Sequence, residues 1–260
     1  MDIYLQGLAH GNISKKNTLS VSTKLRNALG YRSISESKFY NQERVQLNPG
    51  EKIVNQVKSK VNNSAYVSVF DIGKNSPEDR VMAMMIDTFI GQPYNMELRT
   101  NQQLGYIVAG GASSRYNYSY MYFIIQSDGY PADAVEERSL EFLSNISNLL
   151  DEISAEDFET YKSAVREKIN EKSTSIAEEA KKRFNRAFEF DNDHKRDVQS
   201  LAALDAMTID DMKSKLLSVV DSNTSQSVTV LLYAAQHQLS NEHNRSFEDL
   251  HEWKKTRKFQ

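Results

Sequence analysis

Residues 98–108 read Leu-Arg-Thr-Asn-Gln-Gln-Leu-Gly-Tyr-Ile-Val, and this run joins the end of a helical pattern to the start of a strand. Arg99 presents several donors in a rigid, permanently charged fork, while the Tyr106 hydroxyl both donates and accepts hydrogen bonds. Together these two groups could hold a peptide carbonyl or stabilise an oxyanion. Gly105 suits a backbone that bends or closely approaches another chain, or a simple bulge. A purely structural alternative is an Arg that caps the helix, a Thr-Asn turn and a buried Tyr.

The segments around this run predict an α+β fold. Ser76-Pro77-Glu78-Asp79 supplies an N-cap, a proline at the first helical position and acids in the first turn, so a helix is expected to reach about Ile90 and to break at Gly91-Gln92-Pro93. The other helices are predicted over 131–150, 154–172, 174–190, 194–205 and 208–220. Strands are predicted over 42–47, 52–58 and 65–71 as an antiparallel meander, then over 104–112, 117–127 and 226–234. This order favours a mostly antiparallel sheet with helices packed on one face.

The N-terminal segment is too small to form a core of its own. It contains a predicted strand over 3–9, a predicted helix over 14–29 and a connector over 30–41 that is rich in Ser, Tyr and charge. We therefore expect the main domain to begin at about Phe39.

Four tyrosines alternate along the strand predicted over 117–127 and just before it. A continuous strand would place their rings on one face and those of Met121, Phe123 and Ile125 on the other. One interpretation is the wall of a peptide-binding chamber. The other is an ordinary sheet face beneath helices, with its hydroxyls satisfied. These tyrosines are Tyr116, Tyr118, Tyr120 and Tyr122.

Composition excludes several classes of function. The 260 residues carry a net charge of −3, which gives no electrostatic signature of nucleic-acid binding. Cysteine is absent, so disulfides, thiol catalysis and cysteine metal sites are excluded. No span approaches the ~20 apolar residues of a membrane helix, and the N-terminus lacks the pattern of a secretory signal. No glycine-rich phosphate loop is present.

Imidazole and carboxylate groups gather near the C-terminus, at His237, Glu242, His243 and His251. These are zinc-ligating residue types, but their spacing matches no compact metal motif. Their Gln-, Ser- and Asn-rich surroundings favour a solvated loop instead. A metal site built from them is the less favoured alternative.

The run 98–108 closely resembles the signature of the C-terminal half of the insulin-degrading enzyme and pitrilysin family of zinc peptidases. Residues 8–14, 123–127 and 188–191 are also similar to their counterparts in that family. The resemblance implies that residues 1–38 are the strand-helix remnant of a preceding, third domain plus a linker, and that residues 39–260 are the fourth domain. It also implies that Arg99 and Tyr106 bind a peptide substrate near a zinc ion held by the N-terminal catalytic half. The likeness around 188–191 and the tail at Trp253 favours a periplasmic or secreted bacterial protein.

The zinc motif of that family is absent from this chain. The family requires His-x-x-Glu-His on a helix, and none of the five histidines stands in that pattern or its inverse. We therefore expect the chain to be inactive alone and to hold no zinc. The alternatives are an interaction or structural module without a peptidase role, and a free-standing metal-binding enzyme that uses the late histidines.

Overall fold

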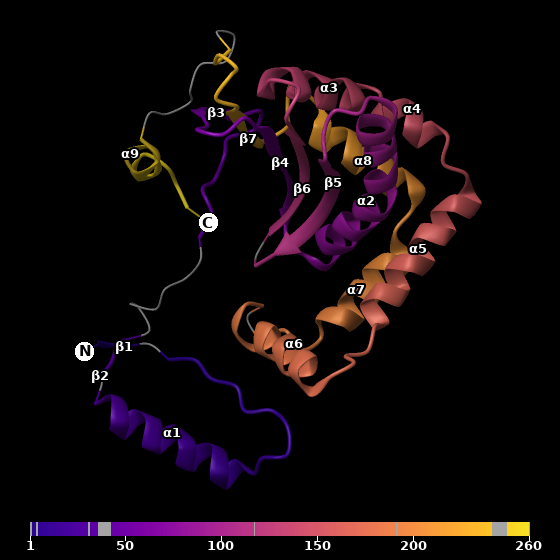
Figure 1. Ribbon diagram of the computed structural model, residues 1–260. Helices are drawn as coiled ribbons and strands as arrows, with labels where there is room; N and C mark the ends of the chain where they lie inside the picture. Colours follow the sequence, from indigo (N-terminus) through magenta and orange to yellow (C-terminus); the bar gives the residue numbers. More distant parts are fainter. Residues whose placement is uncertain are drawn as a thin grey trace. The chain divides into compact units, whose positions relative to one another are not determined.

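The computed structural model describes residues 2–3, 5–30, 32–35, 43–116, 118–190, 192–240 and 249–259 (Figure 1). The chain divides into two compact units, which we describe separately. One unit combines residues 1–43 with Asn170–Arg196, and the other combines Arg44–Ile169 with Asp197–Gln260. No helix among the described residues is long and apolar enough to cross a membrane.

The larger unit is built on a five-stranded sheet with the strand order β3-β7-β4-β6-β5. Neighbouring strands are antiparallel, except that β3 and β7 are parallel. The predicted mostly antiparallel sheet of an α+β fold is therefore confirmed. The strands are β3 (Lys52–Lys58), β4 (Ser64–Lys74), β5 (Ile107–Arg115), β6 (Tyr118–Ser127) and β7 (Ser227–Tyr233).

The predicted antiparallel meander is wrong in two respects. First, β7 lies between β3 and β4 and pairs with both, so these two strands are not neighbours. The apolar strand β7, from the far end of the chain, pairs with the backbone N–H and C=O groups of both β3 and β4. The local sequence of β3 and β4 does not indicate that a third strand lies between them. Second, residues 43–47 form no strand, because Val45 makes only an isolated bridge to Phe259. Residue 42 lies outside the described residues.

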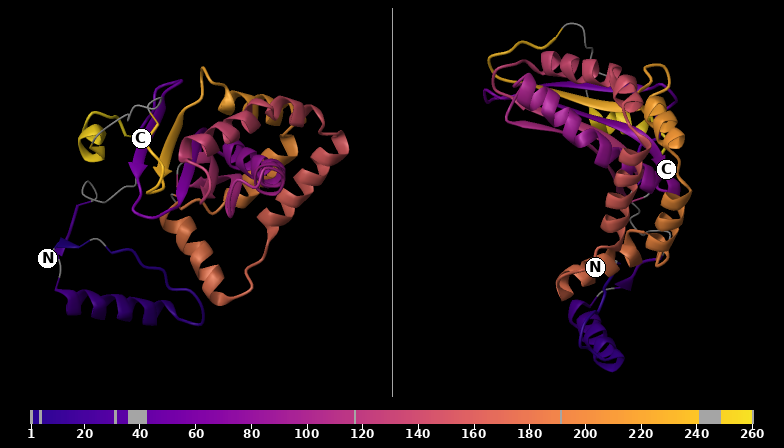
Figure 2. Two further views of the ribbon diagram at one scale, coloured as in Figure 1. Left: turned by 45° about the horizontal axis from the view of Figure 1, so that its top comes forward. Right: turned by 90° about the vertical axis from the view of Figure 1, so that its right-hand side faces the viewer.

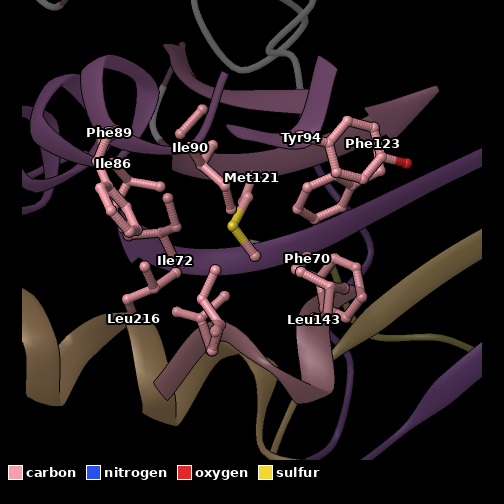
Figure 3. Close-up of a cluster of buried hydrophobic side chains, with 14 of the residues drawn as sticks. Phe70, Ile72, Ile86, Phe89, Ile90, Tyr94, Met121, Phe123, Leu143 and Leu216 are labelled. Atoms are coloured by element: carbon pink, nitrogen blue, oxygen red, sulfur yellow. The ribbon is translucent and has the colours of Figure 1, made fainter. Parts of the chain in front are cut away.

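One face of the sheet is covered by helices and forms the core. Figures 1 and 2 show α2, α3 and α8 together on one side of the strands. Along β6, Met121, Phe123 and Ile125 are fully buried on this side. Figure 3 shows Met121 between the β4 side chain Ile72 and the α2 side chain Ile90. The helices of this unit are α2 (Pro77–Asn95), α3 (Ala132–Ser144), α4 (Ile146–Asp151), α5 (Ala155–Asn170), α7 (Arg196–Ala206), α8 (Ile209–Val220) and α9 (Leu250–Lys255).

The predicted helix starts are confirmed by their hydrogen bonds. The Ser76 hydroxyl accepts from the Asp79 backbone N–H at the start of α2. At α8, the Thr208 hydroxyl and the Asp211 carboxylate cap each other's backbone reciprocally. The helix predicted over 131–150 is instead divided at Asn145, where α3 ends and α4 begins.

The predicted break at Gly91-Gln92-Pro93 is wrong. Helix α2 continues through Pro93 to Asn95 and passes directly into a π-helical turn, η2 (Met96–Asn101). Tyr94 and Leu98 are both fully buried just beyond the proline. Their burial offsets the helix hydrogen bond that a proline cannot donate.

The smaller unit contains α1 (Lys15–Leu29), α6 (Ile176–Phe188) and a two-residue parallel pairing of β1 (Asp2–Ile3) with β2 (Arg32–Ser33). The helix predicted over 14–29 is confirmed as α1, with Ser14 as its N-cap and Gly30 as its left-handed C-cap. The strand predicted over 3–9 is wrong, because residues 5–10 have no strand pairing. Phe39, the expected start of the main domain, lies outside the described residues.

Candidate substrate-binding site

The turn that carries Arg99 and Tyr106 is anchored by buried leucines on both sides. Leu98 is fully buried in η2, and Leu104 is buried in the loop that follows. The Leu104 backbone N–H donates to the Leu98 carbonyl oxygen at 3.0 Å, which ties the loop back onto the helix end. The anchors fix the backbone between them, so the intervening polar residues are held outward.

Gly105 allows this loop to reach β6. A β-carbon at this position would stand 1.9 Å from the Gln126 carbonyl oxygen and 2.8 Å from its carbonyl carbon. No side chain fits there, because real β-carbons do not approach backbone atoms so closely. The close approach to another strand explains this glycine, and it delivers Tyr106 to the start of β5.

The Glu97 carboxylate links two side chains of the turn. Glu97 accepts hydrogen bonds from the Gln102 side-chain amide at 2.9 Å and from the Asn101 amide at 2.7 Å. The hydrogen bond from Gln102 is the larger cause and the one from Asn101 the smaller, and together they hold the pKa of Glu97 below its ordinary value. The adjacent Gln103 has a positive φ of 53°, a backbone conformation that residues other than glycine rarely adopt.

Arg99 and Tyr106 lie side by side at the surface. The Arg99 guanidinium carbon is 5.7 Å from the centre of the Tyr106 ring, which is a cation–π distance. Tyr106 is 83% exposed, so the alternative with a buried tyrosine is wrong. Neither side chain has a hydrogen bond or an ion pair with another residue in the described part of the chain. Their donors are therefore directed to solvent.

Two apolar neighbours of this pair were missed by the sequence analysis. Met96 is 49% exposed in η2 and Ile107 is 42% exposed at the start of β5. Met96 stands three residues before Arg99, and Ile107 directly follows Tyr106. An exposed apolar residue is common and carries no sequence signal by itself, so only the structure reveals that both side chains are exposed.

Tyr118, Tyr120 and Tyr122 form a row on β6, on the face of the sheet opposite the helical core. Successive ring centres are 5.4 Å and 6.3 Å apart. The rings do not lie beneath the core helices α2, α3 and α8, because Met121 and Phe123 occupy that face; Tyr118 and Tyr120 instead line a cavity together with residues of α9. The rings are half-buried on the other face.

Tyr116 does not belong to this row. It lies in the turn between β5 and β6 with a φ of 50°, so the strand alternation does not extend to it. Its ring is instead 5.1 Å from the Arg115 guanidinium carbon. The prediction assumed that side chains alternate between the two faces of a continuous strand. That alternation ends at Tyr116, because this residue lies in a turn with positive φ.

The row and the Arg99–Tyr106 pair are not in contact. Tyr122 pairs with Gly111 and Tyr118 pairs with Arg115 across β5 and β6. At the rise of a strand, these points lie about 17 Å and about 30 Å along β5 from Tyr106. The two features are therefore separate places on the same domain.

The residues that the structure describes do not form a zinc site. Among the described residues, no group of three or more His, Asp or Glu side chains could hold a metal. The His237 ring hydrogen-bonds the Ser64 hydroxyl at 3.1 Å, and His251 lies in α9. Glu242 and His243 lie outside the described residues. The two late histidines that the structure describes, His237 and His251, therefore belong to no metal-binding group among the described residues.

The part of the chain that carries this site is similar in sequence to known proteins. The family described as "PQQ synthase PqqF-like, C-terminal lobe domain 4" matches residues 85–184, which include Arg99 and Tyr106. A nardilysin-like protein of Arabidopsis thaliana is 28% identical over 184 residues, which are 68% of this chain and 18% of that protein. The insulin-degrading enzyme of Mus musculus is 25% identical over 215 residues, which are 81% of this chain and 21% of that enzyme. The chain is related to the C-terminal part of insulin-degrading enzyme and pitrilysin-like peptidases.

The fold agrees with that relationship. The crystal structure of pitrilysin superimposes with a TM-score of 0.80 at 17% identity, over 96% of this chain and 27% of pitrilysin. The chain spans about a fifth of the length of the curated relatives that it matches. In both comparisons the chain is similar to part of a peptidase of this kind, and its own sequence lacks the His-x-x-Glu-His motif.

Proposed function

We propose that this chain is the substrate-binding, non-catalytic C-terminal part of a metalloendopeptidase that degrades peptides in a closed chamber. The catalytic zinc would belong to the N-terminal half of the same protein. In this proposal, residues 1–38 are the end of a preceding similar domain, and residues 39–260 form the last domain.

One observation carries the proposal: two side chains suited to gripping a peptide are held outward on a rigid turn, and neither has a polar partner in the described part of the chain. The Arg99 guanidinium can donate two parallel hydrogen bonds to a peptide carbonyl or carboxylate, and the Tyr106 hydroxyl can donate one more. The buried Leu98 and the close approach at Gly105 hold both groups before the substrate arrives. A preformed donor pair loses little conformational entropy on binding.

The site has the features of peptide recognition rather than of catalysis. Arg99 is permanently protonated and serves as neither a general base nor a metal ligand. Met96, three residues before Arg99, and Ile107, directly after Tyr106, are both exposed and supply apolar surface for substrate side chains. A binding role thus uses every group present, while a catalytic role would need a base or a metal from elsewhere in the protein.

The test is peptide turnover by the full-length protein with Arg99→Ala or Tyr106→Phe. We expect turnover to fall by about tenfold or more in each variant, because a donor to the developing oxyanion or carbonyl is lost. Arg138→Ala and Tyr130→Phe are matched controls, since both residues are exposed and lie in or next to α3. Circular dichroism of each variant checks that the fold is intact. Unchanged turnover in both test variants would favour a module that keeps the fold without a role in peptidolysis.

A further inference from the structure

A cavity lies on the face of the sheet opposite the helical core, in the larger unit and remote from Arg99 and Tyr106. Its volume is about 310 Å³, at the lower end of the range for small-ligand pockets. Its floor is the open face of the sheet, where Val69, Val228, Tyr118 and Tyr120 lie. Its other walls are the segment 44–47 and helix α9, which Figure 1 shows on the side of the sheet opposite α2.

The walls of this cavity are tied to each other and to the sheet. The Gln46 backbone N–H donates to the Lys258 carbonyl oxygen at 2.8 Å, which joins segment 44–47 to the chain after α9. The Gln226 side-chain amide donates to the Leu47 carbonyl oxygen at 2.6 Å. Arg257, just after α9, pairs with Glu51. Three segments far apart in sequence therefore form a preorganised cavity rather than a loose gap.

The lining is mostly apolar, with aromatic rings. The Tyr118 ring lies between the Tyr120 ring, with centres 5.4 Å apart, and the Arg44 guanidinium carbon, at 5.1 Å from its centre. Trp253 of α9 adds a third ring to the lining. Burial raises the pKa of Tyr118, so its hydroxyl stays protonated near neutral pH and can donate a hydrogen bond. These surfaces suit an apolar or aromatic guest that carries a polar backbone.

The charges at the cavity do not cancel. Arg44 is paired with Asp71 at 2.8 Å. Lys254 also lines the cavity, and its ammonium has no ion pair within the described ranges. One positive charge is thus left over, which favours a guest with a carboxylate next to its apolar group.

We propose that this cavity binds an apolar side chain of a peptide that is flanked by an acidic residue, as a second contact for the polypeptide substrate. The inference rests on the proposed function, because it takes a peptide as the guest. The cavity volume suits one large side chain with its adjoining backbone, and Lys254 meets the neighbouring carboxylate. The pocket then fixes the register of a bound peptide at a distance from Arg99 and Tyr106.

The chain supplies its own probe for this test. Trp253 is the single tryptophan of the sequence and lines the cavity, so its fluorescence reports occupancy of this site. We would titrate the 260-residue chain with acetyl-Gly-Phe-Asp-Gly-amide. The expected result is a saturable change in Trp253 emission. The matching peptides with Ala in place of Phe, or with Lys in place of Asp, are expected to bind about tenfold more weakly or worse.

A matched pair of variants tests the position. Val228 and Val230 lie on the same strand and the same face, and they are 41% and 37% exposed, but only Val228 lines the cavity. We expect Val228→Lys to weaken binding of the Phe-Asp peptide by about tenfold or more. Val230→Lys should weaken the same binding by less than about twofold. Circular dichroism checks that both variants fold. Equal losses in the two variants, or a signal that never saturates, would overturn the proposal, as would octanoate binding tighter than the peptide.

The same titration separates this inference from the proposed function. A four-residue peptide is too short to span the distance of about 30 Å along β5 between Tyr118 and Tyr106. Arg99→Ala should therefore leave its binding unchanged. If the peptide causes no change in Trp253 emission while turnover still depends on Arg99 and Tyr106, only the proposal of a peptide-binding cavity is overturned. A retained response, with turnover insensitive to those residues, would overturn the proposed site instead.

Discussion

Gly105 and Gln126 approach so closely that a β-carbon on Gly105 would stand 1.9 Å from the Gln126 carbonyl oxygen. This contact brings the loop after η2 onto the end of β6 and sets where Tyr106 leaves the backbone. The position of the candidate site therefore depends on a residue without a side chain.

Gly105→Ala is expected to destabilise the fold by about 1–3 kcal/mol, because the added methyl forces the loop away from β6. Gly129→Ala is the matched control, since a β-carbon at Gly129 would meet nothing within 4 Å. Denaturant unfolding monitored by circular dichroism measures both. Equal midpoints for the two variants would show that the loop relaxes without cost.

Glu97 supplies a prediction about pH. The pKa of Glu97 lies below its ordinary value because Gln102 and Asn101 donate to its carboxylate. Its contribution to stability is therefore present above the unfolded-state pKa and is lost as pH falls through the lower folded-state pKa. We expect the turn to loosen only at acid pH, below the ordinary pKa of a glutamate side chain.

An NMR titration of the Glu97 side chain checks this prediction. Gln102→Ala should raise the measured pKa of Glu97 towards its ordinary value, because one donor to the carboxylate is removed. Gln236→Ala is a control, since that amide donates to the Asp128 carbonyl oxygen instead. A pKa of Glu97 that does not move in Gln102→Ala would mean that the hydrogen bond from Gln102 does not form in solution.

Features governed by nearby residues could be predicted from the sequence. The caps at Ser76 and Thr208 are hydrogen bonds over three residues, so residue type and spacing suffice to find them. Arg99 and Tyr106 could likewise be selected as candidates from one short run of sequence, and their role in binding stays a prediction. Their mutual distance and the exposure of Tyr106 needed the tertiary structure.

Features governed by distant residues could not be predicted. The continuation of α2 past Pro93 depends on the burial of Tyr94 and Leu98 by side chains from other elements. The place of β7 between β3 and β4 depends on pairing over more than 150 residues of sequence, as in Ala65 with Leu232. The cavity beside Trp253 likewise needs three segments that are separate in the chain.

The capping box at α8 is expected to be a measurable source of stability. The Thr208 hydroxyl accepts from the Asp211 N–H at 3.2 Å, and the Asp211 carboxylate accepts from the Thr208 N–H at 2.9 Å. Thr208→Ala should cost about 1 kcal/mol, as the loss of an N-cap does in other helices. Thr224→Ala is a matched control, because its hydroxyl makes only a 3.5 Å contact at the surface. Thermal unfolding of both variants measures the difference. Equal stability of the two variants would mean that water satisfies the Asp211 N–H as well as the Thr208 hydroxyl does.

The edge of the sheet at β5 is protected by side chains of α2. The Ala112 N–H donates to the Asp87 carboxylate at 3.2 Å, and the Asn95 side-chain amide donates to the Val108 carbonyl oxygen at 2.8 Å. Lys168 of α5 holds the same carboxylate at 3.2 Å. These contacts occupy backbone groups that an edge strand would otherwise offer to another chain.

The double variant Asp87→Ala/Asn95→Ala is therefore expected to lose about 1 kcal/mol per hydrogen bond and to associate with itself as its concentration rises. Sedimentation velocity over a concentration series measures the association. Asn148→Ala/Asp151→Ala is the matched control, because these residues make only exposed contacts in and beside α4. Equal sedimentation of the two double variants would mean that the packing of α2, rather than these two side chains, keeps the β5 edge from pairing.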